Sequence, residues 1–168
     1  MTADLLIDAF SRIHDVVHHV LRGLTTEQLS FRLDEETNSI AWLVWHLTRI
    51  QDDHIADAAG TEQVWTADGW ADRFALPFDV SATGYGHSAD EVAAVLVESG
   101  KLLTGYHDAV FERTLRFVEQ LTEADLSRIV DESWDPPVSL GVRLVSVIAD
   151  DLQHAGQAAL VRGIVARG

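Results

Sequence analysis

Apolar residues recur along most of the chain at the three- and four-residue spacing of an amphipathic helix. The pattern predicts four long helices, over residues 4–22, 39–59, 88–120 and 140–166. Gly23 and Gly60 end the first two helices, and either Asn38 or Ser39 is a suitable N-cap for the second. Glu91, three residues after Ser88, completes a capping box at the start of the third. No segment alternates apolar and polar residues as a half-buried strand does, so the fold class is all-α.

The periodicity is lost between residues 60 and 87. This segment is rich in aromatic residues and glycines, among them Trp65, Trp70, Phe74, Phe78 and Tyr85. Aromatic residues argue against disorder, and a long connection inside a compact domain usually has a function. The sequence therefore predicts a single domain over residues 1–168, a four-helix bundle with a long ordered crossover between its second and third helices.

Composition narrows the class of protein. The chain of 168 residues has a formal net charge of −15 and no cysteine. Such a charge repels phosphate backbones, so neither nucleic acid nor an anionic membrane is expected as a partner. Without cysteine there is no disulfide and no cysteine nucleophile, which favours a cytoplasmic protein. Any thiol chemistry must use a thiol supplied from outside.

A carboxylate and an imidazole lie four residues apart in the last predicted helix. Asp150 and His154 therefore project from the same helical face, one turn apart. His46 lies between Leu43 and Ile50 on the apolar face of the second predicted helix, so it also points toward the core. Two imidazoles and one carboxylate suit zinc, nickel, iron or manganese and leave positions open for water or substrate.

The alternative is a purely structural role, in which His46 is an ordinary packed core histidine. Asp150 weakens that alternative, because a buried carboxylate without a partner is costly. Either Arg143, seven residues earlier on the same face, pairs with Asp150, or a cation does. We predict a metal site formed by His46, Asp150 and His154.

Other titratable residues compete for a role. His14 and His18 share the four-residue spacing, but they fall at or beyond the margin of the apolar stripe, so we predict surface histidines. Asp151 is an alternative to Asp150, although its direction favours a neighbouring helix or solvent. Asp53 lies about 10 Å along the axis from His46, too far to share one ion easily, and is assigned to the surroundings of the site.

Pocket residues are predicted on both helices. Trp42 precedes His46 by one turn, and Gln157 extends the face of Asp150 and His154, where it could orient a ligand through a hydrogen bond. Trp42, Gln157, Asp53 and Arg143 are therefore the candidates for the pocket. The sequence assigns no catalytic residue and contains no G-x-G-x-x-G, P-loop, H-E-x-x-H or G-x-S-x-G motif.

Two stretches resemble the signatures of DinB-like proteins. One is Asn38-Ser39-Ile40-Ala41-Trp42-Leu43-Val44-Trp45-His46-Leu47 with the following Gln51-Asp52-Asp53-His54, and the other is Asp150-Asp151-Leu152-Gln153-His154-Ala155-Gly156-Gln157 with Arg162-Gly163. The sequence also resembles an actinobacterial branch near the mycothiol-dependent enzymes. The resemblance implies a four-helix bundle, often a homodimer, that holds a divalent metal through His46, Asp150 and His154. Many relatives have His or Glu in place of Asp150.

Relatives with known activity use a low-molecular-weight thiol, such as mycothiol or bacillithiol, whose thiolate the metal activates. The resemblance therefore implies a thiol S-transferase that acts on a small electrophile, with zinc as the first choice of metal. A metal-dependent hydrolase, or a non-catalytic bundle that binds small molecules or is associated with stress, are the alternatives.

Overall fold

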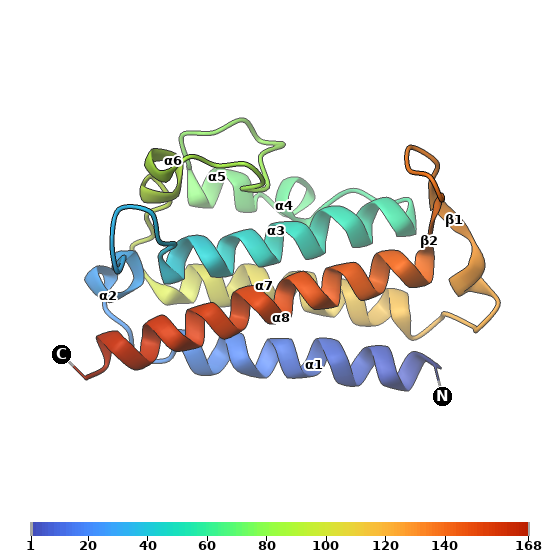
Figure 1. Cartoon of the computed structure of the whole chain (residues 1–168), viewed down its shortest axis with the longest axis horizontal. Helices are drawn as coiled ribbons and strands as arrows, with labels where there is room; N and C mark the ends of the chain where they lie inside the picture. The colour runs from blue at the N-terminus through green and yellow to red at the C-terminus, as the bar shows by residue number, and fades with distance from the viewer. Residues whose placement is uncertain (1, 168) are drawn as a thin grey trace.

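Four long helices run side by side along the long axis of the molecule. The computed structural model describes residues 2–167. Within these residues the long helices are α1 (Thr2–Leu21), α3 (Ile40–Ala59), α7 (Gly100–Val118) and α8 (Leu140–Val165). In Figure 1, α8 lies in front and α7 behind, both between α3 above and α1 below. Each of α1 and α3 packs against both α7 and α8, so α1 and α3 occupy diagonally opposite positions.

Apolar side chains fill the space between these helices. The fully buried set includes Ile13, Val17, Leu43, Leu47, Leu103, Val110, Leu144 and Val147. They come from the predicted apolar stripes, and their removal from water stabilises the packing. No helix within the described residues is both long and apolar enough to cross a membrane.

The predicted ends of three long helices are close to the observed ones. At α3 the Oγ of Ser39 accepts a hydrogen bond of 3.1 Å from the backbone N–H of Trp42, and Gly60 ends the helix with a φ of 66°. At α8 the Oγ of Ser139 accepts from the N–H of Val142 at 3.4 Å. These caps hold the two helices that carry His46, Asp150 and His154.

The predicted third helix is divided in two. The capping box at Ser88 begins a short helix, α6 (Ala89–Ala93), and α7 begins at Gly100 after Ser99 as a new N-cap. Between them the chain turns so that Val95 and Val97 are buried in the core. Gly100 approaches α1 closely: a Cβ there would lie 3.3 Å from the carbonyl oxygen of Leu21. The prediction of one helix over residues 88–120 was wrong because tertiary burial of these valines overrides the local periodicity.

The connection between α3 and α7 is ordered and contains the short helices α4 (Val64–Ala67) and α5 (Trp70–Phe74) as well as α6. It lies over α3 (Figure 1). The buried carboxylate of Asp52 ties it down, accepting from the N–H groups of Val64 at 2.9 Å and Trp65 at 2.7 Å and from the Tyr106 hydroxyl at 2.8 Å. Arg49 donates from Nε to the carbonyl of Ala82 at 3.1 Å.

Smaller elements complete the two ends of the molecule. They are α2 (Thr26–Ser30), the 3₁₀ turn η1 (Asp125–Ser127), and the strands β1 (Ile129–Asp131) and β2 (Val138–Ser139). The strands form an antiparallel pair in which Ile129 faces Ser139 and Asp131 faces Val138. This hairpin was not predicted, since each strand is too short to produce an alternating pattern.

Candidate metal centre

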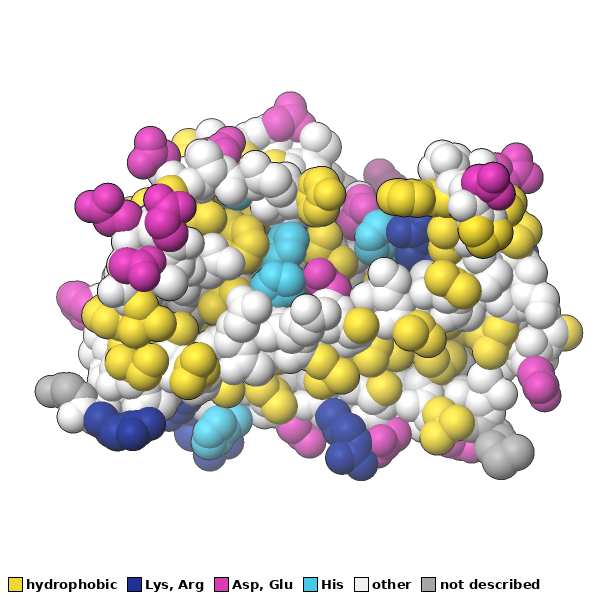
Figure 2. All heavy atoms as spheres, in the orientation of Figure 1, with side chains coloured by type: hydrophobic (Ala, Val, Ile, Leu, Met, Phe, Trp, Pro, Cys, Tyr) yellow, Lys and Arg dark blue, Asp and Glu magenta, His cyan; other side chains and the backbone are white. Residues whose placement is uncertain are grey.

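His46, Asp150 and His154 meet where α3 packs against α8. One possible ligand atom from each side chain lies within 4.8 Å of the other two. Figure 2 shows histidine and acidic side chains at the bottom of a hollow on this face of the molecule. The spacing in the sequence placed Asp150 and His154 on one face of α8, and the α3–α8 packing brings His46 across to them.

The His46 ring has its orientation set by the crossover. Its Nδ1 lies 2.6 Å from the carbonyl oxygen of Thr83. Because a carbonyl only accepts, Nδ1 must carry the hydrogen, and a neutral ring then keeps the Nε2 lone pair for a ligand. Burial is the main cause that lowers the pKa of His46, which favours this neutral form. The Nε2 atom lies 4.0 Å from Asp150 Oδ2.

Asp150 and His154 stabilise opposite charges on each other. Burial raises the pKa of Asp150, but the neighbouring imidazoles of His154 and His46 outweigh it and lower the pKa overall. Burial likewise lowers the pKa of His154, but its contacts with Asp150 outweigh this and raise it. The Nδ1 of His154 lies 2.9 Å from the backbone carbonyl of Asp150 and 3.3 Å from Oδ2. The carboxylate is therefore negative between two nitrogen ligands.

One atom of this group lacks a conventional partner. Asp150 Oδ2 is buried and has no hydrogen-bond partner among residues 2–167, and its ion-pair neighbours are His154 Nδ1 at 3.3 Å and His46 Nε2 at 4.0 Å. A buried anionic oxygen without a hydrogen bond is costly, and a cation among the three side chains would satisfy it. The donor set, two imidazole nitrogens and one carboxylate oxygen, fits a divalent transition metal.

The crossover approaches His46 so closely that only glycine fits. Gly84 has a φ of 93°, and a Cβ there would lie 2.8 Å from His46 Nδ1. Trp42 covers the other face of His46, with ring centroids 4.5 Å apart and planes at 16°. The Trp42 Nε1–H donates to Nδ1 of His87 at 3.2 Å, which links the indole to the same loop.

Several contacts of the loop with His46 were missed from the sequence. Neither the Thr83 carbonyl nor Gly84 was predicted, and His87 was not among the predicted pocket residues. The glycines at 84 and 86 immediately before His87 were the available signal of a tight loop. A backbone carbonyl, however, has no signature in the sequence.

Arg143 does not neutralise Asp150. Its Nη2 donates to Asp131 Oδ2 at 2.7 Å, and its Nη1 lies 3.4 Å from His54 Nδ1. Of the two partners considered for Asp150, the structure thus rules out the arginine. The adjacent Asp151 is fully buried, and neither carboxyl oxygen has a hydrogen-bond partner among the described residues. Burial raises the pKa of Asp151, and this side chain does not join the triad.

Arg143 and Asp53 line a cavity of about 420 Å³, together with His54 and Asp131. None of the three triad side chains lines this cavity, but the charges of His54 and Asp150 influence each other's pKa. Asp53 accepts a hydrogen bond from Gln63 Nε2 at 2.7 Å. Gln157 instead lines a separate cavity with Asn38 and Leu43, and no hydrogen bond joins it to the triad within residues 2–167. The four predicted pocket residues therefore do not line one pocket: Asp53 and Arg143 share a cavity, Gln157 lines another, and Trp42 stacks on His46.

His14 and His18 are not simple surface residues. They converge on Asp108 of α7, and the three side chains form a second group with the spacing of metal ligands. Both side chains are partly exposed at the margin of the apolar stripe, as predicted, but helical periodicity within α1 could not show that α7 would place a carboxylate there.

Comparison with known proteins agrees with this architecture. The sequence matches the family model described as Mycothiol-S-transferase over residues 5–167. The crystal structure of a conserved protein from Enterococcus faecalis is similar, with a TM-score of 0.93 and 30% sequence identity over 100% of this chain and 99% of that chain. Among curated proteins, none matches the sequence. Because the family model spans nearly all of the sequence, the chain belongs to the mycothiol-S-transferase family.

Proposed function

We propose that the protein is a four-helix-bundle S-transferase that joins a low-molecular-weight thiol, of the mycothiol type, to a small electrophile at a divalent metal. The main observation behind this proposal is that His46, His154 and Asp150 converge, and that the buried Oδ2 of Asp150 has no hydrogen-bond partner among the described residues. Membership of the mycothiol-S-transferase family supports this chemistry.

His46, Asp150 and His154 would hold the cation, with zinc the best match to this donor set. When bound, it supplies Lewis acidity that lowers the pKa of an incoming thiol, so that a thiolate is present at neutral pH. The Thr83 carbonyl holds the His46 ring in the tautomer that leaves Nε2 free. The Asp150 backbone carbonyl does the same for His154, and stacked Trp42 excludes water from one side.

The sulfur must come from a co-substrate, because the chain contains no cysteine. The cavity of about 420 Å³ lined by Arg143, His54 and the carboxylates of Asp53, Asp57 and Asp131 offers space and polar contacts. We assign this cavity to the thiol co-substrate, whose polar groups Arg143 and Asp53 would contact.

A metal-dependent hydrolase is the second candidate. Zinc hydrolases use two imidazoles and one carboxylate with water in the open position, which is the same donor set. Turnover of an ester or amide without added thiol would favour hydrolysis, and turnover only with thiol would favour transfer.

The test combines metal content with activity. Protein purified without chelators and loaded with zinc is assayed for consumption of 1-chloro-2,4-dinitrobenzene with and without mycothiol. We expect His154→Ala to lose the metal and at least about 100-fold in thiol-dependent rate, since it removes a ligand. Gln153→Ala is the matched control, because Gln153 is exposed on the same helix and its one side-chain hydrogen bond within residues 2–167 is to the carbonyl of Ala149. Equal zinc and equal rate in His154→Ala would overturn the proposal.

A further inference from the structure

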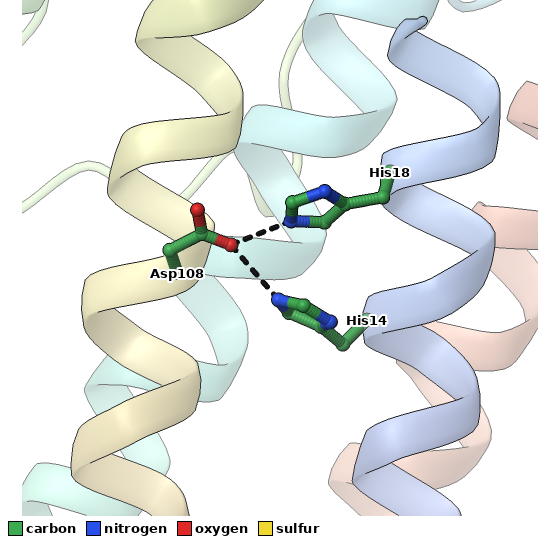
Figure 3. Close-up of side chains that lie close together, drawn as sticks. All are labelled: His14, His18 and Asp108. Carbon is green, nitrogen blue, oxygen red and sulfur yellow. Dashed lines mark hydrogen bonds and ion pairs between the residues drawn. The ribbon is translucent and has the colours of Figure 1, made fainter.

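His14 and His18 project from adjacent turns of α1 toward Asp108 on α7 (Figure 3). The Nε2 atoms lie 2.8 Å and 2.6 Å, respectively, from the same oxygen, Asp108 Oδ1. We propose that these three side chains form a second site, for a divalent transition-metal cation, which links α1 to α7. It is separate from the triad of α3 and α8 and does not rest on the proposed transferase activity.

The ligand atoms already converge. One nitrogen from each imidazole and one carboxylate oxygen all lie within 4.8 Å of one another. Two histidines four residues apart on a helix present their nitrogens to one point, and a carboxylate from a facing helix supplies a third ligand of the four in a tetrahedral or the six in an octahedral shell. Zinc, nickel, cobalt and copper are the cations that this donor set selects. On binding, each Nε2 gives up its hydrogen so that the imidazole carries one hydrogen, on Nδ1, and any second proton on a ring passes to solvent.

The three side chains are exposed enough for an ion to enter, and packing restricts the motion of His14. The side chains of His14, His18 and Asp108 are 23%, 37% and 42% exposed, so a hydrated ion can enter and retain water in the remaining positions. The His14 ring is stacked on Phe111, with centroids 4.2 Å apart and planes at 23°. This packing limits the rotation of His14 and reduces the side-chain entropy lost on binding.

The electrostatic surroundings favour a cation. His107 lies behind His14, with ring centroids 5.6 Å apart, and is fully buried. Burial lowers the pKa of His107 to about 3, so this ring is neutral and does not repel a bound ion. Contacts with His18 and His14 overcome the effect of burial and lower the pKa of Asp108, which keeps it anionic.

The two groups lie on different helix pairs. The triad joins α3 to α8, whereas this cluster joins α1 to α7, and α1 and α3 are diagonally opposite (Figure 1). The groups share no side chain, so each can be removed without deleting a ligand of the other. A cation here connects residues 14 and 18 to residue 108, far apart in the chain, and it stabilises the folded state because the unfolded chain cannot assemble the ligands.

Zinc stoichiometry tests the proposal on the full chain. Metal-stripped protein is titrated with zinc and the bound ions are counted by native mass spectrometry for wild type, His14→Ala/His18→Ala and His46→Ala/His154→Ala. We expect two ions for wild type and one for each double variant. His19→Ala is the matched control, because His19 is exposed on α1, and it should keep both ions.

The outcomes separate this inference from the proposed function. One ion in wild type that survives in His14→Ala/His18→Ala overturns the second site and leaves the triad intact. One ion in wild type that survives only in His46→Ala/His154→Ala supports the second site and removes the first. Loss of zinc in His19→Ala to the same extent would show unspecific histidine binding and overturn the inference.

A less disruptive substitution tests the same site in case a double alanine variant fails to fold. Asp108→Asn keeps the size and partial exposure of the side chain but removes its charge, and we expect zinc affinity at this site to fall at least about 10-fold. In His46→Ala/His154→Ala, zinc at one hundred times its dissociation constant should raise the melting temperature by roughly 5–10 °C. The additional Asp108→Asn substitution should reduce this rise. An unchanged affinity and an unchanged rise would contradict the proposal.

Discussion

The molecule contains two groups of two histidines and one aspartate, and they are organised differently. In the triad of α3 and α8, two imidazoles are oriented by backbone carbonyls, from Thr83 at 2.6 Å and Asp150 at 2.9 Å. In the cluster of α1 and α7, both imidazoles contact Asp108 itself. An imidazole whose Nδ1 is held by a backbone carbonyl keeps Nε2 for a cation, whereas in the cluster both Nε2 atoms already contact Asp108 and must exchange that contact for a metal bond. We therefore expect tighter binding at the triad.

Burial separates the two groups as well. The His46 side chain is 6% exposed, whereas those of His14 and His18 are 23% and 37% exposed. The loop that contains Gly84 lies directly against the His46 ring of the triad. Water exclusion strengthens electrostatic effects on a bound substrate, so the triad is suited to chemistry and the cluster to holding helices together.

The largest expected effect is that of His46→Ala. The variant deletes a ligand from α3 and leaves the Thr83 carbonyl without its donor. We expect the thiol-dependent rate to fall at least about 100-fold and the free energy of unfolding to fall by about 1–3 kcal/mol. Steady-state kinetics and urea denaturation measure the two effects. His14→Ala should leave the rate unchanged, and a comparable loss there would erase the distinction between the groups.

Gly84→Ala tests whether the loop positions the triad. The new Cβ would approach His46 Nδ1 to 2.8 Å at a φ of 93°, so strain and steric overlap should together cost roughly 3 kcal/mol. We also expect about a 10-fold loss of rate from displacement of the ring.

Gly86→Ala is the control for this experiment. It has a similar φ of 74°, but its Cβ would have no atom of the described chain within 4 Å. It should cost only about 1 kcal/mol and leave the rate unchanged. Equal effects of the two variants on rate would show that the loop does not position His46.

His107 predicts a pH dependence on the α1–α7 side of the molecule. The groups that influence it are His14, His18 and Asp108, and its pKa falls from 6.5 to about 3 in the folded protein. Between these values the unfolded chain binds a proton that the folded chain does not, so stability falls as the pH falls. The free energy of unfolding of wild type should therefore fall by about 2 kcal/mol more than that of His107→Leu when the pH is lowered from 7 to 5.

Urea denaturation from pH 7.5 to 4.5 measures this difference for metal-free protein. His19→Leu is the control, because an exposed imidazole should not produce the same slope. Parallel stability curves for wild type and His107→Leu would contradict the assignment of a buried neutral ring.

The smallest expected effect is that of Asp108→Asn without metal. The carboxylate is 42% exposed, and partly exposed ion pairs contribute little after solvent screening. We expect the free energy of unfolding of metal-free protein to change by less than about 1 kcal/mol, as measured by urea denaturation at pH 7.5. A much larger change would show that the ion pairs themselves, rather than a cation, are what this cluster is built for.

The sequence by itself determined the helical character, the ends of α1, α3 and α8, and the shared face of Asp150 and His154. These features are local: caps and periodicity act over one or two turns. The same logic placed His46 toward the core, because its neighbours Leu43 and Ile50 define the apolar stripe of α3. It also identified an ordered crossover from its aromatic residues.

Only the tertiary structure decided which partners meet. Helical spacing left Arg143 open as the partner of Asp150, but the β1–β2 hairpin offers it Asp131 at 2.7 Å. Periodicity within α1 could not reveal Asp108, which is contributed by α7 about ninety residues later. The Thr83 carbonyl is a backbone group that every residue possesses, so its role depends on where the loop lies. Long-range packing sets these contacts, and a local pattern carries no information about it.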